Sequence, residues 1–255
     1  MTLDLGALSP NLSFLPASAA EAFGQAAILL VVGLAFAVPA RRNFYAAWFG
    51  LALATLILYE LLLTRFFGLI PSWPPGADWN WLGKVLSFSG MLMVAAAPIY
   101  GWARCGVTLD HRKGAWIGYA FLAVLCAWLF YAAWSGGGDA GGGRADWETF
   151  AFQWTMPGLD EELFYRGVLL LALNEAFRAR WTLLGARIGY GGLLTVIAFG
   201  LAHALDYDKG YTVDLVAFLE TGPPSLILLW LREKTGNLIA PVIAHNAANG
   251  AFTLF

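Results

Sequence analysis

The residues of this sequence that could do chemistry occur in three short groups. The first group is the stretch DEELFYR at residues 160–166, at the start of an apolar run. Glu162 and Arg166 lie four positions apart on one helical face, with the acid first, which is the favourable order for an ion pair. Glu161 lies about 100° further round such a helix and has no partner of this kind. The spacing therefore predicts a structural ion pair between Glu162 and Arg166, and a spare carboxylate at Glu161.

The acidic residues of this first group have two interpretations. Two adjacent carboxylates beside one arginine have coupled pKa values in a medium of low dielectric, and such coupling suits a general base. The structural interpretation is that the acids stabilise the start of a helix after Pro157 and Gly158, where the helix dipole favours negative charge. We adopt the structural interpretation for Asp160 and the chemical one for Glu161.

Two further groups follow toward the C-terminus. His203 ends the stretch FGLAH, which begins at Phe199, and His245 begins the stretch HNAAN, which ends at Asn249. A single histidine in an apolar helix is more often a packing residue than a catalyst, so His203 alone is a weak signal. His245 and Asn249 share one helical face among alanines that allow close packing. On their own, these two are equally well explained as a polar clamp between helices.

Together, the three groups have a chemistry that none has alone. Carboxylates, an imidazole, and an imidazole with an amide lie on successive apolar segments, and we expect them to converge on one buried polar site. The set contains a base, hydrogen-bond donors and groups that bind water, but no nucleophilic side chain. It fits the activation of a water molecule that attacks a carbonyl carbon, with His and Asn donors stabilising the oxyanion.

The elements that must position these residues are membrane helices. Only 13% of the 255 residues are charged and 59% are hydrophobic, whereas a soluble domain has about 25% charged residues. This composition excludes a soluble enzyme fold as the main architecture. The formal net charge of −2 offers no basic surface for nucleic acid. Cys105 and Cys126 form no metal-binding or disulfide pattern and are expected to be buried apolar residues.

Apolar runs long enough to cross a bilayer core recur along the whole chain. Because they are continuous rather than alternating, they predict helices and not barrel strands. We predict an all-α polytopic membrane protein of one domain, residues 1–255, with about eight transmembrane helices. Four lie in the N-terminal part, 1–134, and four in a catalytic core, 147–255, which holds the active site. The predicted helices are 22–39, 44–63, 82–101, 115–134, 155–177, 190–206, 212–231 and 238–254.

The connecting segments predict the orientation. A Gly-rich segment from Ser135 to Asp146 is typical of a flexible linker between the two halves. Most of the basic residues follow the first, third, fifth and seventh runs, and positively charged loops stay in the cytoplasm. Both termini are therefore expected to be extracytoplasmic. The basic residues of these loops are Arg41, Arg42, Arg104, Arg112, Lys113, Arg178, Arg180, Arg187, Arg232 and Lys234, and the alternate loops carry only Arg65, Lys84, Arg144 and Lys209.

The three groups, taken in their order along the chain, resemble a known family. Three stretches look like the signature motifs of the CAAX protease and bacteriocin-processing family, also called the Abi family or the Ras-converting-enzyme-like glutamic intramembrane proteases. They are Glu161-Glu162-x-x-x-Arg166, Phe199-x-x-x-His203 and His245-x-x-x-Asn249. The resemblance covers Asp160 to Phe255, with no departure at the motif positions. Each motif is loose by itself, but three in order are specific.

The resemblance implies an endopeptidase that works within the membrane and needs no cofactor. By similarity, Glu161 is the base that activates the water, and His203 helps to hold that water. His245 and Asn249 form the oxyanion site. The supporting residues are Glu162, Arg166 and Phe199. The implied substrate is a membrane-anchored protein or peptide in the lipid bilayer, cut in C-terminal processing or sorting, and the expected location is a bacterial inner membrane.

Three alternatives stay open from the residues themselves. His203, His245 and Glu161 could form a His₂Glu zinc site, although the sequence has no HExxH motif. A transporter or proton channel could use the buried Glu and His residues, together with Glu60, Asp214 and Glu220, as a proton pathway. No inverted repeat of broken helices supports transport, and we expect those three acids to be solvated near helix ends or to line a cavity. The third alternative is a membrane scaffold without catalytic activity.

Overall fold

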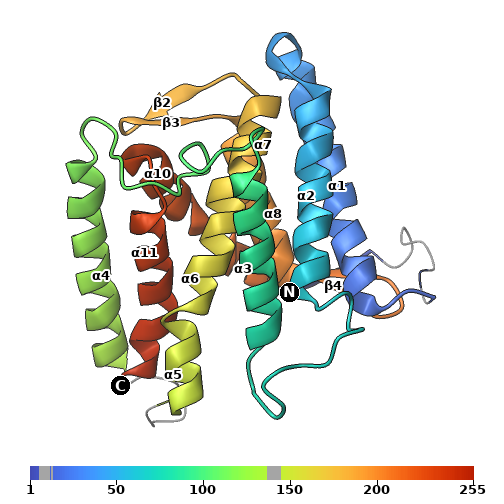
Figure 1. The fold of residues 1–255 in the computed structure, drawn as a ribbon, viewed down its shortest axis with the longest axis vertical. Coiled ribbons are helices and arrows are strands. Elements are labelled where there is room, and N and C mark those ends of the chain that lie inside the picture. Colours follow the sequence, from blue (N-terminus) through green and yellow to red (C-terminus); the bar gives the residue numbers. More distant parts are fainter. Residues whose placement is uncertain (6–11, 13, 137–144) are drawn as a thin grey trace.

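The computed structural model describes residues 1–5, 12, 14–136 and 145–255, and it is mainly helical (Figure 1). The long apolar runs form helices because the bilayer core offers backbone groups no water to bond. The Gly-rich linker predicted at Ser135–Asp146 falls mostly on 137–144, which lies outside the described residues. The helices are α1 (Ala17–Ala40), α2 (Ala46–Leu63), α3 (Trp81–Ala96), α4 (Trp116–Gly136), α5 (Trp147–Gln153), α6 (Met156–Glu161), α7 (Leu170–Ala176), α8 (Tyr190–Ala204), α9 (Leu215–Thr221), α10 (Ser225–Thr235) and α11 (Ile239–Gly250).

Within the described part of the chain, four helical spans are long and apolar enough to cross a membrane. They are Ala17–Asn43, Ala46–Leu63, Trp116–Gly136 and Leu215–Thr235, and α3 and α8 are shorter apolar helices. The prediction of a mainly helical membrane protein is thus confirmed. The count of eight crossings stays a prediction.

Three predicted helices differ in detail from the observed ones. The third ends at Ala96 rather than 101, since Pro98 disfavours helical geometry at the preceding residue. The fifth is α6, a π-helical segment η3 (Glu162–Leu169), and α7. The seventh begins as a strand and is then divided into α9 and α10 at Gly222–Pro224, because two consecutive prolines remove the backbone donors that a helix needs there.

Two small sheets were not predicted from the sequence. Strand β5 (Tyr211–Asp214) pairs antiparallel with both β1 (Thr2–Asp4) and β4 (Leu205–Tyr207), so it is the central strand of a three-stranded sheet near the N-terminus. Strands β2 (Trp181–Leu183) and β3 (Ala186–Ile188) form a hairpin between α7 and α8. Each strand is only three or four residues long, which is too short for the alternating pattern that identifies a strand in a sequence.

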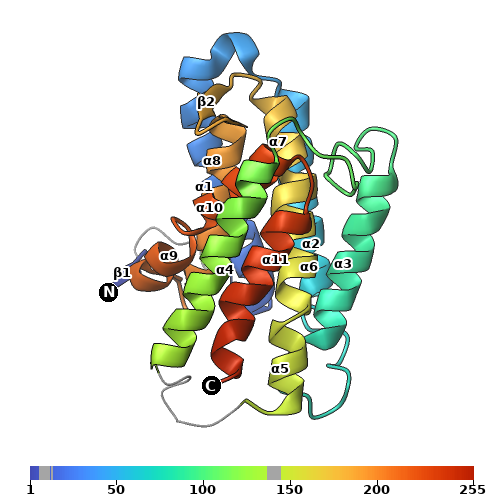
Figure 2. The same cartoon turned by 90° about the vertical axis from the view of Figure 1, so that its left-hand side faces the viewer.

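The segments that connect the helices lie at two opposite ends of the molecule (Figures 1 and 2). Helices α1 and α2 pack with α7 and α8, α3 packs on α6, and α4 packs across α10 and α11. The loop between α3 and α4 and the β2–β3 hairpin lie at one end, which we call the basic end because it carries Arg112, Lys113 and Arg187. Helix α5 and the C-terminus lie at the other end, which we call the pocket end.

The loop at the basic end gives a first testable prediction. Cys105 lies in this loop and is fully buried, and burial raises the pKa of its thiol to about 11. At pH 8, therefore, only about one such thiol in a thousand is a reactive thiolate. We expect a Cys126→Ser variant to resist iodoacetamide at pH 8, as measured by mass spectrometry, until denaturant unfolds it. Rapid modification of the folded variant would contradict the packing of this loop.

Candidate active site

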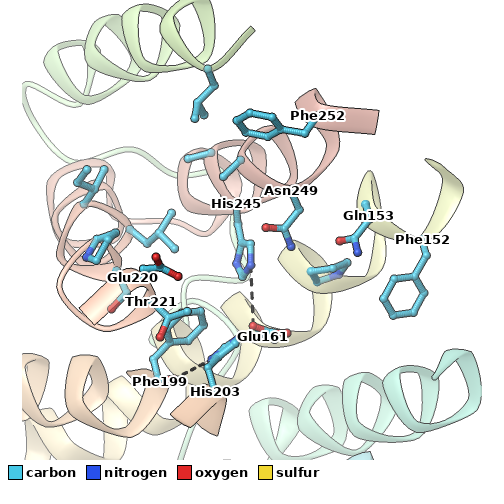
Figure 3. A pocket seen from close by; sticks show the side chains of 18 of the residues that line it. Phe152, Gln153, Glu161, Phe199, His203, Glu220, Thr221, His245, Asn249 and Phe252 are labelled. Atoms are coloured by element: carbon cyan, nitrogen blue, oxygen red, sulfur yellow. Dashed lines mark hydrogen bonds and ion pairs between the residues drawn. The ribbon is translucent and has the colours of Figure 1, made fainter. Parts of the chain in front are cut away.

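One pocket brings the three sequence groups together. It has a volume of about 840 Å³, is lined by residues of α3–α6 and α8–α11, and includes Glu161, His203, His245 and Asn249 on its wall. Figure 3 shows these four side chains directed into the same space. They come from three helices, α6, α8 and α11.

Glu161 has two carboxylate oxygens in different surroundings. Oε1 is 2.6 Å from Nζ of Lys84, which donates a hydrogen bond to it. Oε2 lies 3.8 Å from Nε2 of His245 and accepts no hydrogen bond from any described residue. The side chain is 13% exposed. One oxygen is therefore held in place, and the other is available to accept a proton.

The structure corrects two predictions, namely the loop position of Lys84 and the helix-start position of Asp160. The sequence places Lys84 among the loop residues, but it lies inside α3 and is buried. Asp160 was interpreted as a residue at the start of a helix, yet it lies near the end of α6 and is fully buried. Its Oδ2 lies 3.1 Å from Nζ of Lys84 and accepts a hydrogen bond from Tyr59 at 2.7 Å, while Oδ1 accepts one from Ser87 at 2.7 Å. A buried carboxylate needs such partners, so Asp160 joins α6 to α2 and α3.

Glu162 supports two of the other groups. Its Oε1 is 3.0 Å from Nη1 of Arg166, so the ion pair expected from the spacing is present, even though η3 is a π-helix. The same oxygen is 2.8 Å from Nδ1 of His245. Because a carboxylate accepts, Nδ1 carries the proton of this bond, and Nε2 is left facing Glu161. Glu162 therefore fixes the orientation of His245.

His203 is oriented by its own helix. Its Nδ1 donates to the carbonyl oxygen of Phe199 at 2.9 Å, since a carbonyl can only accept, and Nε2 is left free for the pocket. The guanidinium of Arg166 lies 4.4 Å from the centre of the Phe199 ring. That ring also lies edge-on to the His245 ring at 5.9 Å. Phe199 thus packs between the supporting arginine and both imidazoles.

The two asparagines of α11 have different surroundings. Asn249 faces the pocket and is half-buried. Asn246 accepts a hydrogen bond from the backbone nitrogen of Gly158 at 2.8 Å. A Cβ atom at Gly158 would lie 2.4 Å from Oδ1 of Asn246, so only glycine permits α6 and α11 to approach this closely. Asn246 therefore holds the helix that carries Glu161 against the helix that carries His245.

The three other acids that a proton pathway would use lie in three different surroundings. Asp214 accepts hydrogen bonds from the backbone nitrogens of Val216 and Ala217 and caps α9. Glu220 lines the pocket, as the sequence allowed. Glu60 lies in the last turn of α2, near a helix end as expected, but it is buried rather than solvated. Within the part of the chain that the structure describes, no three His, Cys, Asp or Glu side chains are grouped as ligands for a metal ion.

This geometry can be compared with known proteins. The family model described as type II CAAX prenyl endopeptidase Rce1-like matches residues 144–251. Residues 144–251 are therefore similar to this family, and we call this segment the Rce1-like domain. All three sequence groups lie within it, as the resemblance of the motifs predicted. No curated protein and no solved structure matches the chain.

The Rce1-like domain does not contain every residue that shapes the site. Tyr59, Lys84 and Ser87 come from α2 and α3, which precede it, and sequence reasoning missed all three. The lysine had a usable signal, because a charged side chain within an apolar run is costly and marks a functional candidate. The tyrosine and serine had none, since their types are common in membrane helices.

Proposed function

We propose that the protein is an intramembrane endopeptidase in which Glu161 activates the attacking water. The observation that carries the proposal is that the two oxygens of the Glu161 carboxylate have different surroundings. Lys84 holds Oε1, while Oε2 faces Nε2 of His245 in the pocket. The Rce1-like domain supports a protease in general terms, and the arrangement of these groups supports the glutamate-activated form.

The reaction then needs one base and two kinds of donor. Oε2 of Glu161 takes a proton from a water held with Nε2 of His203, and the water oxygen attacks the carbonyl carbon of the peptide bond. The amide of Asn249 donates to the oxyanion, and Nε2 of His245 does so when its ring carries a second proton. Glu161 returns the proton to the leaving nitrogen, the C–N bond breaks, and a carboxylic acid and an amine result; the proton of the acid then passes to the amine, which leaves a carboxylate and an ammonium group.

The substrate that we propose is the C-terminal tail of a membrane-anchored protein on the extracytoplasmic side of a bacterial inner membrane. Two observations support this side. The basic residues lie at the end opposite α5 and the C-terminus, and the pocket includes residues of α5 together with Phe252 and Thr253, next to the C-terminus. If the basic end faces the cytoplasm, the pocket opens toward the other leaflet.

Orientation has a direct test. A single reporter cysteine at Gly141, in a variant that lacks Cys105 and Cys126, is expected to react with an impermeant maleimide added to intact cells. A matched cysteine at Lys113, in the loop at the basic end, is expected to react only after lysis. Labelling of the Gly141 position from the cytoplasm alone would overturn the proposed side.

The function itself is tested by a survey of protein termini. Membrane and secreted proteins are compared between hosts that carry the wild-type protein or Glu161→Gln, each with and without a chelator. Peptide ends that are present with the wild type, absent with the variant and indifferent to the chelator support the proposal and identify the substrates. Ends that disappear with the chelator indicate a zinc enzyme. If no ends differ while the variant still has a phenotype, transport or scaffolding replaces proteolysis.

The two asparagines of α11 provide a matched pair of variants. Asn249→Ala is expected to lower kcat by about 10²–10³-fold, the usual effect of losing one oxyanion donor, with little change in melting temperature. Asn246→Ala is expected to lower the melting temperature, because the buried N–H of Gly158 loses its acceptor. Kinetics and thermal unfolding in detergent measure both effects. If both variants lost the same factor in kcat and the same amount in melting temperature, Asn249 and Asn246 would not have the different roles proposed.

A further inference from the structure

A second cavity lies at the basic end and shares no lining residue with the proposed active site. Its volume is about 660 Å³. Its wall combines the loop before α4, the end of α7, the β2–β3 hairpin and the end of α10. The charged residues on this wall are Arg112, Lys113, Glu175, Arg178, Arg180, Arg187, Glu233 and Lys234.

The two carboxylates of this cavity are already paired. Oε2 of Glu233 lies 2.7 Å from Nη1 of Arg112, and its Oε1 accepts from the Asn174 amide at 3.0 Å. Glu175 accepts from Arg178 at 3.0 Å and from Arg104 at 2.9 Å. The wall therefore keeps a surplus of positive charge that its own acids do not neutralise.

Lys234 is the most informative of the remaining cations. It is only 8% exposed, and no hydrogen bond or ion pair joins it to another described residue. Its Nζ lies close to Gly185: a Cβ atom on this glycine would be only 2.5 Å from Nζ. An ammonium on the wall of a cavity, carried by a largely buried side chain and without a counter-charge, can bind an anion that enters the cavity. The rule that keeps positive charge in the cytoplasm accounts for the sign of this end, but not for a buried, unpaired lysine that faces a cavity.

The hairpin beside the cavity carries apolar side chains that face outward. Trp181, Leu183 and Leu184 are 41%, 49% and 78% exposed. Apolar and aromatic side chains next to cations are typical of the membrane interface, where anionic headgroups lie. The apolar side chains beside the cavity therefore favour the anionic headgroup of a lipid over a free anion from bulk water.

We propose that this cavity binds the phosphate headgroup of an anionic phospholipid, with Lys234 as its innermost contact and Arg187 and Lys113 at its entrance. Salt bridges from ammonium and guanidinium groups to phosphate oxygens supply the missing counter-charge. The exposed side chains of the hairpin then pack against the acyl chains. The site is independent of the peptidase proposal, because it shares no residue with the active-site pocket.

The test is thermal unfolding of the purified protein in a neutral detergent with added short-chain phosphatidylglycerol. We expect this lipid to raise the melting temperature, phosphatidylcholine of the same chain length to have little effect, and high salt to reduce the shift. In Lys234→Met the apparent affinity for phosphatidylglycerol is expected to fall about tenfold or more. Lys209→Met, at an exposed cation of the other end, is the matched control and is expected to keep the wild-type shift.

Three results would overturn the proposal. They are equal shifts with the anionic and zwitterionic lipids, an unchanged affinity in Lys234→Met, and an equal shift with inorganic phosphate alone, which would indicate a free-anion site. If Lys234→Met does not fold, Arg187→Gln replaces it, because this side chain is exposed and its loss should not disturb the core. Arg187→Gln is also expected to weaken binding about tenfold, and an unchanged affinity would equally overturn the proposal.

Discussion

Glu161→Gln is expected to lower kcat for peptide-bond hydrolysis by about 10³-fold, within the range of about 10²–10⁴ for the loss of a general base. The amide keeps the shape of the carboxylate but cannot take a proton from water. Single-turnover kinetics on a peptide identified by the terminal survey would measure this effect. KM is expected to change little, because the carboxylate acts on the water rather than on the substrate.

The matched control for this variant is Glu220→Gln. Glu220 lines the same pocket from α9, and it has no role in the proposed reaction. We expect it to keep kcat within a few-fold of the wild type. A loss in Glu220→Gln as large as that in Glu161→Gln would mean that the pocket depends on its total negative charge, and Glu161 would lose its special role.

Lys84→Met is expected to destabilise the protein by about 3–5 kcal/mol, the usual effect of removing one partner of a buried ion pair. Lys84 lies between two carboxylates, 2.6 Å from Glu161 and 3.1 Å from Asp160. Without its ammonium, two neighbouring acids remain buried with no counter-charge. Unfolding by sodium dodecyl sulfate from mixed micelles would measure the free energy of unfolding.

The double variant Lys84→Met with Asp160→Asn separates charge balance from packing. Asp160→Asn removes one of the two buried carboxylates, and its amide oxygen accepts from one of the two hydroxyls of Tyr59 and Ser87 while its amide nitrogen donates to the other. We expect the double variant to recover a large part of the stability lost in Lys84→Met. If the double variant is as unstable as the sum of the two single variants, the pairing of Lys84 with the acids is not the source of its effect.

The sequence predicted the parts of the site that follow from spacing along one helix. Glu162 and Arg166, four positions apart, form the expected pair, and His245 and Asn249 line one pocket from one helix. The contact of His245 with Glu162 could not be predicted in this way, because it joins residues 83 positions apart. Such a contact depends on how α6 and α11 pack, which local periodicity does not encode.

The inward position of the Lys84 ammonium was not predicted from the sequence for a different reason. The rule that made Glu161 a candidate, namely the cost of a charge in an apolar run, applies equally to Lys84. It lies near the start of α3, and a lysine there can extend to the interface and keep its ammonium in water. Only the packing of α3 against α6 shows that its ammonium instead turns inward, toward Asp160 and Glu161.

The fold was predicted well where the signal was long and poorly where it was short. Continuous apolar runs identified α1, α2 and α4 to within a few residues. The strand β5 and the break at Gly222–Pro224 were merged into one helix, because apolar composition alone cannot distinguish a short strand and two short helices from one long helix. This break lies beside the site, because Glu220 and Thr221, which directly precede it, line the pocket.

The most direct test of the central claim, that Glu161 activates a water that attacks the peptide carbonyl, is a single turnover in H₂¹⁸O. Purified protein in excess over a substrate peptide would be analysed by mass spectrometry, with chelator present. The account predicts one ¹⁸O atom in the new C-terminal carboxylate of the product and none in the peptide that contains Glu161. Incorporation of ¹⁸O into Glu161 would show that this carboxylate attacks the carbonyl itself and forms a covalent intermediate, which would contradict the account.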